Sequence, residues 1–298
     1  MVCVSLFFLT GEIVQPDIDR DYFKIPELEK IDRVSLTSSR GSVELKYAGN
    51  RWRVNDTWEA DAQMIKVLFA TLQQAEPRRP VSATLKDSVS QWLKNKGIHV
   101  TLWEEGISKT AFIAGGNTLK TEAWFLKEEE AMPYIMNIPG YRVYVSGIFE
   151  LDVQGWRNKR IFDFNWRNFK SLTATFPSEP KQNFEIENKQ GYFGIKSLTA
   201  TDTAKLNNYL DNVSLLFATR FIENGLPAID SLTANVPAAR IEITDIADRS
   251  YSLELFALRN KDNEVYGRLA GGQIVTLNKI KIAEIVRKKE YFLPHQGH

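Results

Sequence analysis

The stretch RWRVNDTWEADAQMIKVLFATL at residues 51–72 returns, as a pattern of apolar side chains, in YFGIKSLTATDTAKLNNYLDNV at residues 192–213. Residue 192 stands 141 positions after residue 51, and the same spacing relates Val100 to Ile241 and Tyr134 to Val275. A constant spacing over most of a chain indicates a tandem duplication in which each copy forms one structural unit. The sequence therefore predicts two similar repeats.

Each copy changes from a strand pattern to a helix pattern. Alternating apolar residues over 31–54 predict three strands, and apolar residues then recur at helical spacing from Ile65 to Leu72. Asp61 in the first copy and Asp202 or Thr201 in the second stand where a helix N-cap is expected.

A second strand pattern follows in each copy, over 98–138 and 239–277, and a further helix is expected at 141–151 and at 280–289. Strands that lead into helices without strict alternation indicate antiparallel sheets. The predicted fold class is α+β, with two tandem similar repeats of antiparallel β-meanders, each followed by a helix.

Length and composition fit this organisation. A chain of 298 residues can form two domains that each bury a core without disulfides or metals. The predicted segments are a partial anchor or linker at 1–22, a first repeat at 23–155, an aromatic and basic connector at 156–168, a second repeat at 169–293 and a tail at 294–298. Charge is nearly balanced, with 38 Lys and Arg against 37 Asp and Glu, which argues against a nucleic-acid partner.

Residues 1–9 are apolar except for Ser5. A membrane span needs about 20 apolar residues, and the run also lacks the basic residues that open a secretory signal. Two interpretations stay open: an edge strand, or the last third of a signal or anchor. The polar stretch that follows, up to Asp21, resembles a linker and favours the anchor, in which case Cys3 is a candidate for lipid attachment.

The connector carries the densest local signal. Five basic residues interleave with five aromatic residues and one acid, Asp163, over 156–170. Such interleaving is typical of grooves that bind single-stranded nucleic acid, yet the alternation of Phe162, Phe164 and Trp166 favours a strand whose apolar face packs at the join between the repeats. An anionic ligand or a protein partner is the alternative, and the candidate binding residues, which include one from the preceding segment, are Arg142, Arg157, Arg160, Asp163 and Arg167.

Catalytic and metal-binding patterns have little support. The only cysteine, Cys3, has no base near it in the sequence, and no Ser-His-Asp set is suggested by the three histidines. The terminal His295 and His298 offer two ligands where a zinc site needs three or four. We therefore expect no catalytic residue, no metal and no cofactor.

Four stretches carry a resemblance to a known family: GNRWRVN at 49–55, EPRRPV at 76–81, IPGYRVYVSGIFE at 138–150 and KRIFDFNWRNF at 159–169. On these residues the chain resembles the bacterial family of domain-of-unknown-function 4340. The resemblance implies one N-terminal membrane anchor with the rest of the chain outside the cytoplasmic membrane, and some members lie beside ABC-type export or gliding-motility systems. The family has no established catalytic residues.

Two functions follow as expectations. The first is a non-enzymatic accessory or scaffold protein of the cell envelope, anchored at its N-terminus, that binds an envelope or membrane protein and is associated with an ABC-type transport or gliding-related system. The alternative is a ligand-binding or hydrolytic protein with an anion site between the two repeats, lined by the five candidate residues named above. A complete N-terminus at Met1 would instead indicate a cytoplasmic protein.

Overall fold

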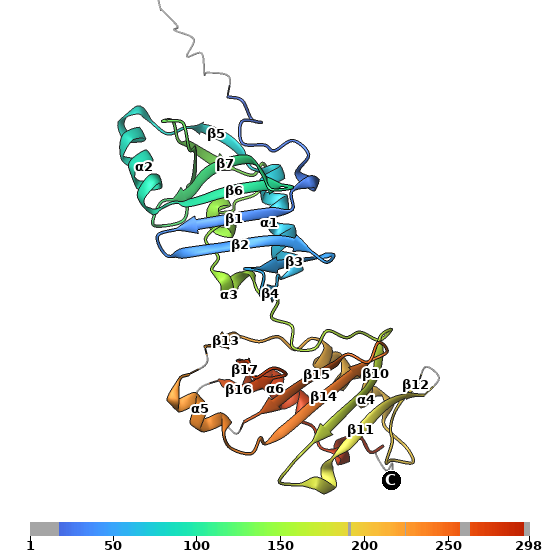
Figure 1. The fold of residues 1–298 in the computed structure, drawn as a ribbon. Helices are drawn as coiled ribbons and strands as arrows, with labels where there is room; N and C mark the ends of the chain where they lie inside the picture. Colours follow the sequence, from blue (N-terminus) through green and yellow to red (C-terminus); the bar gives the residue numbers. More distant parts are fainter. Residues whose placement is uncertain (1–17, 190–191, 224, 257–262, 295–298) are drawn as a thin grey trace, which may run out of the picture. The chain divides into compact units, whose positions relative to one another are not determined.

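The computed structural model describes residues 18–189, 192–223, 225–256 and 263–294. They form two compact units, one that ends at Asn158 and one that begins at Lys159 (Figure 1). The division falls within the predicted connector. Most of the predicted N-terminal anchor or linker, residues 1–17, and the predicted tail from residue 295 lie outside the described residues. None of the described helices is long and apolar enough to cross a membrane.

The first unit is built on a nine-stranded sheet with the order β4-β3-β2-β1-β6-β7-β8-β9-β5. The strands are β1 (Arg33–Ser38), β2 (Gly41–Ala48), β3 (Arg51–Val54), β4 (Trp58–Glu59), β5 (Glu76–Pro80), β6 (Ile98–Glu104), β7 (Ile107–Gly116), β8 (Ala123–Lys127) and β9 (Tyr134–Asn137). The helices are α1 (Ala62–Gln74), α2 (Ala83–Lys96) and α3 (Val153–Trp156), with 3-10 helices η1 (Leu28–Lys30) and η2 (Val145–Ile148). Both prolines of the edge strand β5, Pro77 and Pro80, lie opposite β9.

The second unit is built on an eight-stranded sheet with the order β12-β11-β10-β14-β15-β16-β17-β13. The strands are β10 (Phe169–Thr175), β11 (Phe184–Lys189), β12 (Tyr192–Ile195), β13 (Arg220–Ile222), β14 (Ala239–Asp245), β15 (Ser250–Leu255), β16 (Glu264–Leu269) and β17 (Ile274–Asn278). The helices are α4 (Thr203–Ser214), α5 (Pro227–Thr233) and α6 (Lys279–Ile285), with 3-10 helices η3 (Pro180–Gln182) and η4 (Lys289–Phe292).

The two sheets have the same strand order once β4 is set aside, and every pair of neighbouring strands is antiparallel. In each unit the two predicted meanders join into one sheet, because β1 pairs with β6 and β10 pairs with β14. Leu36 lies opposite Val100, and Ala174 lies opposite Ile241, which is 141 positions after Val100. The predicted fold of two similar α+β repeats is confirmed.

One helix covers the same face of the sheet in both units. The Asp61 carboxylate accepts hydrogen bonds from the backbone N–H groups of Gln63 and Met64 and so caps α1, and Asp202 caps α4 through the N–H of Lys205. The buried residues of α1 share one stripe and face the sheet: they are Ile65, Leu68, Thr71 and Leu72. This packing forms the main core of each unit.

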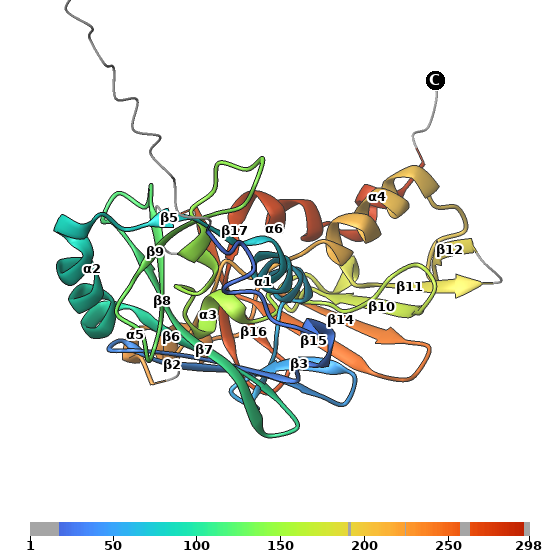
Figure 2. The same cartoon turned by 90° about the horizontal axis from the view of Figure 1, so that it is seen from above.

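The first unit has a second apolar layer on the opposite face of its sheet. Neighbouring residues of a strand point to opposite faces, so Phe112 joins the core beneath α1 while Ile113 points away from it. Ile113 and Leu126 pack against α2, whose Leu93 is fully buried. Consistent with this, α1 and α2 lie apart in both views of the molecule (Figures 1 and 2).

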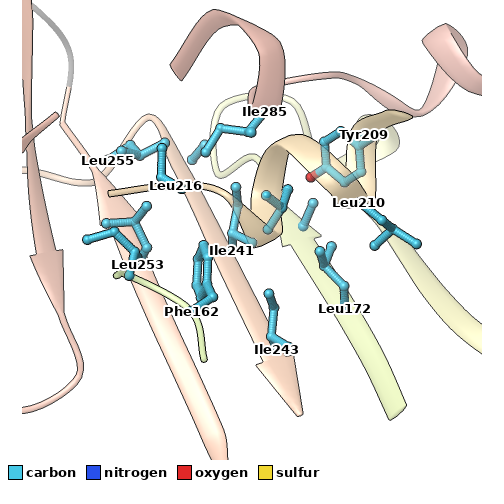
Figure 3. Packing of buried hydrophobic residues seen from close by; sticks show 14 of the residues in the cluster. Phe162, Leu172, Tyr209, Leu210, Leu216, Ile241, Ile243, Leu253, Leu255 and Ile285 are labelled. Atoms are coloured by element: carbon cyan, nitrogen blue, oxygen red, sulfur yellow. The ribbon is translucent and has the colours of Figure 1, made fainter. Parts of the chain in front are cut away.

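The connector differs from the predicted strand. Residues 161–168 form no strand, because the chain instead hydrogen-bonds to the segment after α4: the Ile161 N–H donates to the Leu216 carbonyl and the Ala218 N–H to the Lys159 carbonyl. Phe162 and Phe164 are nevertheless buried as predicted, whereas Trp166, the third residue of the alternation, is 42% exposed. Phe162 is fully buried and lies among Ile241, Ile243 and Leu253 in the core of the second unit (Figure 3).

The helix expected at 141–151 is also absent. Pro139 and Gly140 form a turn between Ile138 and Tyr141, which pair as an isolated bridge, and Gly140 has a φ of 80°, a value that suits glycine. The Ser146 hydroxyl then donates a hydrogen bond of 2.6 Å to the Gly115 carbonyl of β7. This contact ties the segment to the sheet in a short 3-10 turn, whereas the second unit has a regular helix, α6, after β17.

Candidate functional site

The five candidate binding residues divide between the two units. Arg142 and Arg157 belong to the first unit, while Arg160, Asp163 and Arg167 belong to the second. Because the candidates are divided between two units, a shared anion site stays a prediction. Within each unit, the surroundings of these side chains show what they do locally.

Arg157 is packed into the first unit rather than held out to solvent. Its side chain is buried, and its guanidinium carbon lies 4.5 Å from the centre of the Trp58 ring, a cation–π contact. Burial lowers the pKa of Arg157 to about 10, so the group stays charged at neutral pH. Its backbone pairs with Ala60 next to the start of α1. Arg157 therefore helps to hold the end of the first unit against its sheet.

Arg142 is one of the candidate anion-binding residues, and a nearby carboxylate would be the alternative partner for its guanidinium. Among the described residues it makes no ion pair with Glu150 or Asp152. Glu150 instead accepts hydrogen bonds from the Tyr144 hydroxyl, at 2.6 Å, and from the Lys120 ammonium, at 2.7 Å. Burial and the bond to Glu150 raise the pKa of the Tyr144 hydroxyl, so it stays protonated and acts as the donor.

Within the described part of the second unit, the three candidates have separate local surroundings. The Arg160 guanidinium lies over the Phe217 ring at 5.6 Å. The Arg167 backbone N–H donates to the Asn165 side chain within a turn. The Arg249 side chain donates a hydrogen bond to the Asp245 carboxylate, and this bond is the main reason why the pKa of Arg249 is raised. The negative charge of Asp163 raises the pKa of Arg249 further.

Asp245 itself is a fully buried carboxylate held by local hydrogen bonds. Although burial favours its neutral form, hydrogen bonds from the backbone and side chain of Arg249 and from the Ala247 N–H lower the pKa of the Asp245 carboxyl. All of these donors come from the β14–β15 turn. We interpret this carboxylate as a structural centre of the turn.

The structure contains hollows that the sequence did not predict, and two of them lie in the first unit. The larger cavity has a volume of about 530 Å³ and lies between the β1–β2 hairpin end and the segment after η2. Its lining residues are Leu36, Ser38, Arg40, Gly41, Ser42, Val43, Ile98, Phe149, Glu150, Leu151, Asp152 and Val153.

The second hollow is an apolar groove of about 360 Å³ between α1 and the segment from Ile138 to Ile148. Three of its apolar side chains are unusually exposed: Val67 by 45%, Tyr141 by 66% and Val143 by 54%. We refer to it as the α1 groove. A comparison of the two copies would have revealed the α1 groove from the sequence. The second copy has the polar residues Asn208 and Asp211 where the first has the apolar residues Val67 and Ala70.

His99 lies on β6 with its Nδ1 atom 2.8 Å from the Glu128 carboxylate, a half-exposed surface contact. In the part of the chain that the structure describes, no group of three or more His, Cys, Asp and Glu side chains is arranged to hold a metal ion.

Taken together, the fold and these hollows define a duplicated α+β protein whose first repeat carries open apolar surfaces. Residues 52–239 match the family model described as domain of unknown function DUF4340, and the chain belongs to this family. The match runs from β3 of the first sheet to the start of β14 in the second and so includes both copies of the capped helix. Searches of curated proteins and of solved structures find no match.

Proposed function

We propose that this chain is a non-enzymatic accessory protein of the cell envelope that binds a partner protein through the α1 groove. The observation that carries the proposal is the exposure of Val67, Tyr141 and Val143 side by side in one hollow of the first unit. Clustered exposed apolar side chains are typical of protein-binding surfaces, because water leaves them when a partner covers them.

The second copy shows that the fold does not need this surface to be apolar. The α1 positions of Val67, Ala70 and Thr71 correspond to Asn208, Asp211 and Asn212 of α4, at the same spacing of 141 residues. Asn208 and Asp211 are exposed. The same helix in the same fold is therefore stable with polar residues there, which supports a binding role for the apolar ones.

The envelope location and the association with an ABC-type transport or gliding-related system are parts of the same proposal. Their support is the likeness to relatives that carry one anchor and lie beside such systems. The partner is then an envelope or membrane protein that offers an apolar surface of matching size.

Site-specific photo-crosslinking in cells tests the proposal. The natural gene, with its upstream sequence, is expressed with a photoreactive phenylalanine analogue at Tyr141 or Val143, and the adduct is identified by mass spectrometry after fractionation. We expect one envelope protein to be crosslinked from both positions. Leu119, which is 81% exposed in the β7–β8 connection, is the matched control position.

A Val67→Asp variant supplies the specificity control, since it places a charge in the groove at an exposed helix position. We expect it to abolish the adduct from Tyr141 while the chain stays folded. The proposal fails if Tyr141 and Leu119 give the same adducts, if Val67→Asp leaves the adduct unchanged, or if the chain fractionates with the cytoplasm.

A further inference from the structure

The larger cavity of the first unit has an apolar floor and a charged rim. Leu36, Val43 and Ile98 come from the sheet and Phe149 from the segment after η2, and all four are nearly fully buried. Arg40, at the tip of the β1–β2 hairpin, and Asp152 stand at the rim. A ligand here would place an apolar group on the floor and a polar group outside.

Strand register shows which residues of the second unit occupy the corresponding place. Leu36 lies opposite Val43 in the first sheet, and Ala174 lies opposite Phe184 in the second. Val43 therefore corresponds to Phe184. Ser38, two residues after Leu36 on the same side of the strand, corresponds by the same count to Phe176.

The second unit fills this place with its own aromatic rings. Phe176 and Phe184 are buried, and the Phe184 ring lies 5.0 Å from that of Phe292. The loop from 176 to 183 then reaches the segment after α6: the Lys288 ammonium lies 2.5 Å from the Glu179 carboxylate, and the Gln182 amide donates to Glu290. In the first unit a turn of only two residues joins β1 to β2, so this covering loop is absent.

We propose that the cavity of the first unit binds a short extended peptide segment of a partner protein, which inserts an aromatic side chain and follows it with an acidic residue. The aromatic ring takes the space that Phe176 and Phe184 fill in the second unit and that Ser38 and Val43 leave open. Burial of such a ring removes apolar surface from water, and this favours binding against the cost of ordering the peptide.

The charges around the cavity indicate why the peptide should carry an acidic residue after its aromatic one. In the second unit an acid three residues after the aromatic residue, Glu179, pairs with a lysine. At the rim of the first unit's cavity the cation is Arg40, which comes from the β1–β2 turn and makes no ion pair among the described residues. Glu150, which also lines the cavity, is held by Tyr144 and Lys120. A guanidinium binds a carboxylate through two parallel hydrogen bonds, so an acidic side chain is the group that fits.

This inference deepens the proposed function and depends on its claim that the chain binds a partner, but it concerns a different surface. The probe is a fluorescein-labelled synthetic peptide with the sequence of residues 174–181, ATFPSEPK, which carries the aromatic and acidic groups at the spacing seen in the second unit. Fluorescence anisotropy measures its binding to the purified full chain.

We expect saturable binding, with the Kd raised about tenfold or more by Ser38→Phe, which fills the cavity. Arg40→Gln should raise the Kd about three- to tenfold. This effect is smaller than that of Ser38→Phe because the ion pair between Arg40 and the glutamate of the peptide is exposed to solvent. Arg78→Gln, which removes another exposed arginine of the first unit, is the matched control and should leave the Kd unchanged. Peptides with alanine for phenylalanine, or glutamine for glutamate, should bind correspondingly less tightly.

Val43→Phe, at the position that corresponds to Phe184 in the second unit, is a second cavity-filling variant in case Ser38→Phe does not fold. The proposal is overturned if the peptide shows no saturable binding at millimolar concentration, or if a folded cavity-filled variant binds it as tightly as the native chain. Because the probe is tested on purified protein, its failure leaves the crosslinking result at the α1 groove unaffected, and loss of that crosslink leaves the peptide titration unaffected.

Discussion

The two sheets have the same strand order but cover their outer faces, which lie opposite α1 and α4, in different ways. In the first unit Ile113 lies opposite Leu126, and both are buried under α2. In the second unit Glu254 lies opposite Arg268 at the corresponding positions and also pairs with Arg240. One topology thus tolerates either an apolar layer or a row of ion pairs on this face. The shared inner face, with apolar residues in both copies, is what fixes the strand order.

The largest effect is expected where the second unit relies on aromatic packing. Phe292 is fully buried against Phe184 and Tyr209, so Phe292→Ala should lower the free energy of unfolding of the second unit by about 3–5 kcal/mol. Hydrogen exchange of the full chain, followed by mass spectrometry, should show faster opening in peptides from 169–294. Leu293→Ala, at a half-exposed neighbour, should change stability by less than about 0.5 kcal/mol.

The apolar layer of the first unit provides the next test. Leu93 of α2 is fully buried against the outer face, and Leu93→Ala should cost about 3 kcal/mol. The faster exchange should be confined to the first unit, in α2 and strands β7–β9. Leu85, an exposed residue of the same helix, gives the control substitution Leu85→Ala. Equal effects of the two substitutions would show that α2 does not stabilise the sheet.

Helix capping is common to both units and should have a smaller effect. Asp61→Ala removes the acceptor for two backbone N–H groups at the start of α1 and should cost about 1 kcal/mol. Exchange should rise first in the opening turn of α1. Asp61→Asn keeps a capping oxygen and should retain most of the stability; if it is as damaging as alanine, the hydrogen bonds are not the cause.

The ion pairs of the second unit predict a small, pH-dependent effect. Although burial opposes it, hydrogen bonds from Arg240 and Arg268 lower the pKa of the Glu254 carboxyl. Ionised Glu254 therefore stabilises the fold above its unfolded pKa of about 4.3, and the contribution is lost as pH falls through the lower folded value. The arginines are partly exposed, so solvent screening keeps this below about 1 kcal/mol.

Urea unfolding of the native chain and of Glu254→Gln between about pH 7 and pH 3 measures this contribution. The native chain should be more stable at neutral pH, and the two curves should converge at the acid end. Ile113→Val, at the corresponding position of the first unit, should show a difference that does not depend on pH. A gap between native and Glu254→Gln that is constant with pH would contradict the assignment.

The sequence predicts the duplicated part of the fold well because buried side chains repeat at a fixed spacing. Leu68 and Tyr209, for example, are both fully buried on the helix that covers the sheet. Apolar spacing says less about pairing between distant strands, so the joining of both meanders through β1 and β6 was not predicted. The alternation of Phe162 and Phe164 led to the wrong prediction of a strand. Both side chains are buried in the core although their backbone pairs with no strand, because burial does not require strand pairing.

The candidate sites were harder to predict for a physical reason. The cavity is open because Ser38 and Val43 have small side chains where the second unit has Phe176 and Phe184, and a small residue in place of a ring forms no motif. Its signal lies in the comparison of the copies, since Val43 and Phe184 are 141 positions apart. Charged residues such as Arg157 drew attention through composition, whereas burial against Trp58 gives this arginine a local structural role.

The prolines of β5 affect how the edge of the first sheet can pair with strands of other molecules. Pro77 and Pro80 have no backbone N–H, and the ladder with β9 shifts register between Pro77 and Arg79. A strand of another molecule that approached this edge would find donors missing and the backbone irregular. The edge is thereby protected against intermolecular β-sheet extension, so the first unit can expose apolar hollows to a partner with less risk of aggregation through its sheet.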